Sequence, residues 1–264
     1  MKKKNRLQKL NRLRLAAACL AGSAAWASAH TLSLSTITAQ WFDGTPNSQV
    51  SYLQNGSADA SAVWGDGKQP SSLEFKVAGQ PMNFNLVAGT SPKQPLGLMT
   101  HSNGPIEVGS GITDVKLKIR SNVLLDGVSQ GMRSFDYGFS ILETLNQANP
   151  CADGGKTGAG ANVFGCADRV TLTALPLAQD FAIGTDIFRL KLLGFSADPA
   201  GTTPFNFFWT PEKKNMTAFL LADVTMLQRH VPEPAMLPLL GLGLVGLALS
   251  RRRLGRAQRA GPPV

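Results

Sequence analysis

The chain has 264 residues, with 26 Lys and Arg against 17 Asp and Glu, which gives a formal charge of +9. Seven of the basic residues lie in residues 1–14 and five in residues 251–259, so the section between these ends has a charge of −3. The excess of positive charge is thus confined to the two ends and forms no patch on a folded domain, and we therefore expect no nucleic-acid partner. The middle section, about two hundred residues long, is large enough to bury a sizeable core.

Residues 1–29 have the three parts of a secretory signal peptide. The seven basic residues precede an apolar stretch from Leu15 to Ala25, and small residues follow at Ala27 and Ala29. Cleavage after Ala29 would make His30 the first residue of the exported protein. An uncleaved anchor is the weaker interpretation, because so short an apolar stretch cannot cross ~30 Å of hydrocarbon as a helix.

Residues 30–228 are predicted to form many short strands separated by glycine and proline turns. Apolar and polar residues alternate at 115–120 and 134–141, as in strands with one buried face. Further strands are expected at 31–40, 73–77, 82–87, 169–174, 188–193 and 218–226. A brief helical turn is expected within 141–147. We predict one all-β domain of eight to ten strands, an antiparallel β-sandwich resembling a jelly roll.

Two cysteines remain once the signal peptide is removed, Cys151 and Cys166. Export places them in an oxidising compartment, where we expect a disulfide that closes the glycine-rich loop between them. A Cys/His metal site is the alternative, but no further Cys or His has a ligand spacing.

The C-terminal residues change character twice. Residues 229–234 form a short stalk, kept extended by its prolines, and contain the motif Pro232, Glu233, Pro234. Residues 235–250 are apolar and are expected to form a short transmembrane helix. Residues 251–264 form a basic tail, expected to be cytoplasmic, that begins with Arg251, Arg252 and Arg253.

This order of motif, apolar span and arginine cluster resembles the PEP-CTERM sorting signal of bacterial envelope proteins. The resemblance implies that an exosortase, a membrane-embedded enzyme resembling a cysteine transpeptidase, recognises Pro232-Glu233-Pro234 and that the tail is removed. It also implies transient single-pass residence in the inner membrane, followed by delivery to the cell surface or extracellular matrix.

A second resemblance covers roughly residues 35–230. Trp41, the Trp64-Gly65 pair and the segment from Thr100 through His101 and Asn103 to Pro105-Ile106 occur in an order similar to the THxN family of PEP-CTERM proteins and the related choice-of-anchor K domains. The resemblance implies an exported β-rich protein with no assigned activity. From the residues themselves, Thr100–Asn103 is expected to be a strand end that runs into a turn, with a ligand site at His101 as the alternative.

Two enzyme hypotheses remain beside a non-catalytic one. In the first, His30, its α-amine and a second histidine (His101 or His230) would bind copper, as in secreted polysaccharide-oxidising enzymes. In the second, paired carboxylates such as Asp136 and Glu143 would form a glycosidase site, although both are expected to be solvated. Weak calcium candidates are Asp66 and Asp153.

The preferred hypothesis assigns no catalytic residue, cofactor or metal to the chain. It describes an exported cell-envelope protein, sorted by an exosortase and associated with exopolysaccharide. The aromatic side chains that would stack on sugars, if exposed, are more often core residues; they are Trp41, Trp64, Trp209 and the Phe205–Phe208 cluster.

Overall fold

The computed structural model describes residues 30–66, 68–86, 93–173 and 177–228. These residues divide into two compact units, the first made by residues 30–179 and 189–225 and the second by residues 180–188 and 226–228. In the second unit, Phe181 stacks on Phe188 with 5.7 Å between ring centroids. The predicted signal peptide, stalk, transmembrane helix and basic tail lie outside the described residues.

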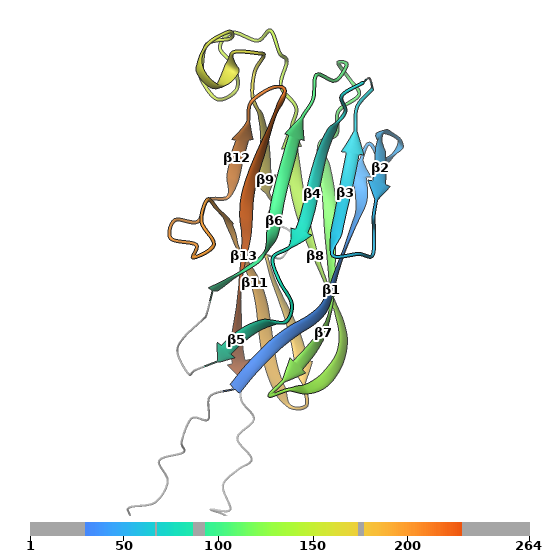
Figure 1. Cartoon of the computed structure of the whole chain (residues 1–264), viewed down its shortest axis with the longest axis vertical. Coiled ribbons are helices and arrows are strands. Elements are labelled where there is room, and N and C mark those ends of the chain that lie inside the picture. Colours follow the sequence, from blue (N-terminus) through green and yellow to red (C-terminus); the bar gives the residue numbers. More distant parts are fainter. Residues whose placement is uncertain (1–29, 67, 87–92, 174–176, 229–264) are drawn as a thin grey trace, which may run out of the picture. The chain divides into compact units, whose positions relative to one another are not determined.

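The described chain is all-β and contains two antiparallel sheets (Figure 1). The six-stranded sheet has the order β12-β9-β8-β7-β1-β5. Its strands are β1 (His30–Thr45), β5 (Met82–Leu86), β7 (Asp114–Leu125), β8 (Val128–Leu142), β9 (Asp168–Leu172) and β12 (Phe207–Thr210).

The seven-stranded sheet has the order β10-β11-β13-β6-β4-β3-β2. Its strands are β2 (Val50–Leu53), β3 (Asp59–Trp64), β4 (Ser71–Val77), β6 (Lys93–Asn103), β10 (Ala178–Ile183), β11 (Asp186–Ser196) and β13 (Lys214–Gln228). Two single-turn 3₁₀ helices, η1 (Asn47–Gln49) and η2 (Gly160–Asn162), complete the described secondary structure.

The core of the first unit lies between the two sheets. Along β7 the burial alternates, with Val115, Leu117 and Ile119 fully buried, because successive side chains of a strand point to opposite faces. Aromatic contacts join the sheets: Phe195 of β11 lies 6.2 Å from Phe139 and 5.0 Å from Phe208, measured between ring centroids. The arrangement is a sandwich in which both inner faces are apolar.

A second link between the sheets is polar. The indole Nε1 of Trp41, on β1, donates to the carbonyl oxygen of Ala60, on β3, at 2.9 Å. The turn between β2 and β3 also holds this tryptophan, because the Asn55 side chain exchanges two 2.9 Å hydrogen bonds with the Trp41 backbone. Trp41 is fully buried, so it stabilises the core and presents no surface to a sugar.

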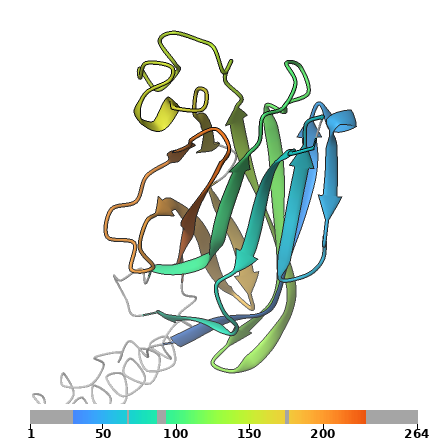
Figure 2. The same cartoon turned by 45° about the horizontal axis from the view of Figure 1, so that its top comes forward.

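The prediction of an all-β chain of antiparallel sheets is confirmed, although the structure has thirteen described strands instead of eight to ten. The prediction of a helical turn within 141–147 is wrong, because β8 continues to Leu142 and residues 143–147 contain no helix. The expected disulfide is present between Cys151 and Cys166, whose Cα atoms are 5.4 Å apart. It closes the loop that Figures 1 and 2 draw in yellow, at the same end of the first unit as the loop of residues 104–113.

Candidate functional site

The Thr-His-Ser-Asn segment occupies the end of β6, as the sequence predicts, but its side chains divide between two faces. His101 is fully buried and Asn103 is 2% exposed, whereas the Thr100 hydroxyl lies on the other face, 2.9 Å from the hydroxyl of Thr217. Strand alternation explains the division, since residues two apart share a face. His101 and Asn103 therefore belong to the interior at the loop-rich end of the sandwich.

His101 is the first of three residues in contact, followed by Trp64 and Glu143, that connect β6 and β3 to the end of β8. Its ring stacks on Trp64, with 5.8 Å between the ring centroids and 14° between their planes. Burial lowers the pKa of His101 to about 3, so the ring is neutral. The indole Nε1 of Trp64 donates to Oε1 of Glu143 at 2.5 Å. Trp64 is thus a core residue that positions a carboxyl group, and it has no surface for sugar stacking.

Glu143 forms a carboxyl pair with Asp168. Burial and the Asp168 charge raise the pKa of Glu143, and burial also raises the pKa of Asp168. The interaction between the two side chains raises the pKa of Glu143 further and opposes the rise at Asp168, so Glu143 is the member of the pair that holds a proton. Oδ1 of Asp168 accepts from the backbone N and the hydroxyl of Thr144, at 2.7 and 2.8 Å, and the side chain of Asn103 also stabilises this carboxylate.

This pair corrects a prediction from the sequence. Glu143 was expected to be solvated, but it is half-buried, because its side chain turns toward Trp64 just after the end of β8. Asp136, its proposed catalytic partner, is exposed on β8 and lies 4.0 Å from Lys118. The true partner, Asp168, comes from the start of β9, and no local pattern in the sequence indicates that pairing.

A third carboxyl group, Glu212, comes from the tight turn between β12 and β13. Lys213 in this turn has φ of +60°, and its backbone N donates to the carbonyl oxygen of Asn103 at 2.9 Å. Glu212 is 2% exposed, and its Oε1 has no hydrogen-bond partner among the described residues. Burial and the Asp168 charge raise the pKa of Glu212 to about 7.

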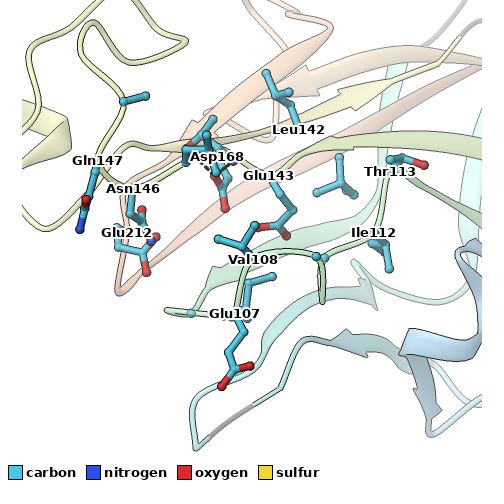
Figure 3. A pocket seen from close by; sticks show the side chains of 18 residues that line it. Glu107, Val108, Ile112, Thr113, Leu142, Glu143, Asn146, Gln147, Asp168 and Glu212 are labelled. Carbon is cyan, nitrogen blue, oxygen red and sulfur yellow. Dashed lines mark hydrogen bonds between the residues drawn. The ribbon is translucent and has the colours of Figure 1, made fainter.

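The three acids line a cleft of about 850 Å³ (Figure 3). Asp168 lies between Glu143 and Glu212 in this view, and the loop of residues 104–113 forms the opposite wall. Apolar side chains surround the acids; they are Ile106, Val108, Ile112, Ile141, Leu142 and Leu145. Val108 and Leu145 are 90% and 63% exposed at the mouth of the cleft.

Two glycines allow the walls to approach the acids. A Cβ on Gly111 would lie 2.7 Å from Cγ of Glu143. Gly165, beside the disulfide, has φ of +141°, and a Cβ there would lie 2.4 Å from Oδ1 of Asn146 and 3.1 Å from Cγ of Glu212. The disulfide loop therefore packs against one side of the cleft at Gly165, where any side chain would collide with Asn146 and Glu212.

A second surface lies on the outer face of the six-stranded sheet. Register aligns Leu142, Arg169 and Trp209 across β8, β9 and β12, and Phe207 lies on the same face, two residues before Trp209. We name Phe207, Arg169 and Trp209 the outer-face row. The guanidinium carbon of Arg169 lies 5.4 Å from the ring centroid of Phe207 and 5.3 Å from that of Trp209. Phe207 is 45% exposed and Trp209 is half-buried.

The remaining candidates do not assemble into a metal site. His30 begins β1, and its Nδ1 lies 2.7 Å from Oδ2 of Asp126, while His101 is buried on the other sheet. Asp153 accepts from the Asn162 side chain and from the backbone of Gly155. In the parts of the chain that the structure describes, no three His, Cys, Asp or Glu side chains are grouped to hold a metal ion. His230 lies outside those parts.

Comparison with known proteins identifies the C-terminal segment. Residues 230–253 match the PEP-CTERM protein-sorting motif. The motif implies export, membrane-anchored transit and processing by an exosortase-like membrane enzyme. No curated protein matches the chain. Within the described residues, no helix is long and apolar enough to cross a bilayer, and the predicted span at 235–250 lies beyond them.

Proposed function

We propose that this exosortase-sorted protein is a cell-envelope component whose β-domain binds exopolysaccharide without catalysing a reaction. The sorting motif supports the proposed location in the cell envelope, because motifs of this kind direct proteins to the bacterial envelope. The THxN and choice-of-anchor K relationship is part of the same proposal. It rests on Thr100, His101 and Asn103, of which two are buried in the polar core described above.

The outer-face row of Phe207, Arg169 and Trp209 carries the binding proposal. Aromatic faces pack against the C–H faces of sugar rings, and a guanidinium group donates to hydroxyl or carboxylate oxygens. Of the aromatic residues that the sequence offers for stacking, Trp41 and Trp64 are buried, whereas Phe207 and Trp209 remain at the surface. Their sheet face continues across β7, where Lys116 and Lys118 lie near the ring of Phe42.

The geometry of the acids favours binding over glycoside hydrolysis. Glycosidases hold their two carboxyl groups about 5–9.5 Å apart, so that a sugar and a water molecule fit between them. Here each acid already has partners within the protein: Oε1 of Glu143 accepts from the indole of Trp64, and Oδ1 of Asp168 accepts two hydrogen bonds from Thr144. A carboxylate with its acceptor sites filled in this way is a poor nucleophile, and the pair instead links the end of β8 to the start of β9 and to Trp64 of β3.

Binding is tested by affinity electrophoresis of the processed protein through gels that contain exopolysaccharide from the producing cells. Trp209→Ala should abolish most of the retardation. Phe164→Ala is the matched control, because Phe164 is also an exposed aromatic residue, 54% exposed, but lies on the disulfide loop. Equal retardation of the wild type and Trp209→Ala would contradict the proposal.

Sorting is tested separately by mass spectrometry of the protein recovered from its native cells. We expect a new C-terminus near Pro232-Glu233-Pro234, and accumulation of a membrane-bound precursor for Glu233→Ala. An intact tail through Val264 on the surface form would contradict processing of this signal.

A further inference from the structure

We propose that the cleft between the loop of residues 104–113 and Glu212 is a binding site for a primary ammonium group on a compact, partly apolar skeleton, such as an amino sugar or an aliphatic diamine. The site is distinct from the outer-face row that carries the exopolysaccharide proposal. The two surfaces adjoin at Leu142, but their key residues are different.

The first argument is the unfilled acceptor on Glu212. This side chain lines the cleft, is 98% removed from solvent contact, and has an Oε1 without a hydrogen-bond partner among the described residues. A buried acceptor without a donor costs free energy, which a ligand that supplies the donor would recover. The carboxyl pair of Glu143 and Asp168 is satisfied internally, so Glu212 is the acid that is available to a ligand.

The second argument is the sign of the charge. Four acids line the cleft from different elements: Glu107 from the 104–113 loop, Glu143 after β8, Asp168 from β9 and Glu212 from the β12–β13 turn. Among the described residues that line it, none is Lys, Arg or His. Lys213 acts on Glu212 from outside the lining, and His101 is neutral. Glu143 holds its proton, so the negative charge comes from Asp168, Glu107 and the ionised form of Glu212. The apolar walls focus this field, which attracts a cation and repels a uronic acid.

The third argument is the shape and polarity of the walls. A volume of about 850 Å³ lies in the range of small-molecule sites, which combine apolar walls with a few polar groups. Ile106, Ile112 and Leu145 offer contact to a hydrocarbon or sugar skeleton, and an ammonium group brings three donors to the acid end. A ligand that combines an apolar skeleton with an ammonium group would therefore fit both the apolar walls and the acidic end of the cleft.

The test is calorimetric titration of the full chain in detergent at pH 7, where both probes still present ammonium groups; the probes are a chitosan oligosaccharide and 1,4-diaminobutane. The N-acetylated form of the same oligosaccharide is the ligand control. We expect binding of at least one amine and none of the acetylated sugar. Binding of the oligosaccharide alone identifies an amino sugar, whereas binding of both probes identifies the ammonium group as sufficient.

The site is assigned with a pair of matched variants. Glu212→Gln removes one charge with little change of shape and should weaken binding about tenfold or more, as expected for a charge-assisted hydrogen bond. Asp136→Asn removes the same charge from an exposed position of β8 that does not line the cleft and should change affinity less than about threefold. Leu145→Lys, at an exposed position of the mouth, should also weaken amine binding by repulsion, even if Glu212→Gln fails to fold.

The pH dependence gives a further readout. Because the pKa of Glu212 is raised to about 7, its carboxylate forms above that pH, and the affinity for 1,4-diaminobutane, which stays protonated throughout, should increase from pH 5.5 to 8. Absence of amine binding at millimolar concentration, equal binding of the acetylated sugar, or unchanged affinity in Glu212→Gln and Leu145→Lys would each overturn the proposal. None of these outcomes bears on the retardation test of Trp209, so the two proposals fail independently.

Discussion

The protonated state of Glu143 makes the stability of the domain depend on pH. The ordinary pKa of a glutamate is 4.5, and burial beside Asp168 raises it in the folded protein. Below pH 4.5 both the folded and the unfolded chain hold the proton, so the folded state incurs no penalty. As pH rises above that value, the unfolded chain releases the proton while the folded chain keeps it, and the free energy of unfolding falls.

The magnitude follows from proton linkage. One proton retained only by the folded state lowers the unfolding free energy by up to about 1.4 kcal/mol per pH unit. Between pH 5 and pH 7 the loss is therefore up to about 3 kcal/mol, which corresponds to roughly 5–10 °C in Tm for a domain of this size. Glu212 has the same sign, since burial raises its pKa too, so wild type alone does not isolate Glu143.

Glu143→Gln isolates the effect. The glutamine amide keeps an acceptor for Nε1 of Trp64 and a donor for Asp168, but it carries no titrating proton. We expect the variant to match wild type near pH 5 and to be more stable at pH 7 by up to about 3 kcal/mol. Urea unfolding of both proteins at pH 5, 6, 7 and 8 measures the difference.

The exposed Glu107 provides the control, since Glu107→Gln should leave the pH dependence unchanged. Parallel stability curves for wild type and Glu143→Gln from pH 5 to 8 would refute the shared-proton description of the pair. A glutamine variant that is much less stable at every pH would refute the hydrogen-bond assignment instead.

Three further predictions concern the surroundings of the cleft. Replacing both Cys151 and Cys166 by Ser should lower the unfolding free energy by about 3 kcal/mol, as expected for a closed loop of this length, and a change below about 1 kcal/mol in urea unfolding would contradict it. Gly165→Ala should lower the unfolding free energy by about 1–3 kcal/mol, because its φ is positive and the new methyl group would crowd the cleft wall. Gly158 also has a positive φ but faces open space, so Gly158→Ala should lower the unfolding free energy less in the same assay. His101→Phe should keep the stack on the indole and remove two ring nitrogens that lack partners, so its Tm should equal or exceed that of wild type; a large drop in Tm would show that the imidazole has a polar role.

Local sequence patterns were sufficient to predict the all-β fold class and the sorting signal. Alternation of apolar and polar residues at 115–120 gives the strand period directly, and the structure confirms it in β7. The loop between Cys151 and Cys166 could be predicted because only two cysteines remain in an oxidising compartment. The sorting signal around Pro232-Glu233-Pro234 is contiguous, so it is readable without any tertiary information.

The cleft is different, because its acids come together only through the order of the strands. Glu143, Asp168 and Glu212 come from three separate places in the chain (after β8, at the start of β9 and in the β12–β13 turn), and each is an ordinary acid in its own sequence neighbourhood. Burial, which no local pattern encodes, raises the pKa of all three, and the Asp168 charge adds to the rise at Glu143 and Glu212. The same holds for Trp64, whose side chain faces inward because of its register on β3 and so supports a carboxyl group that the sequence placed in solvent.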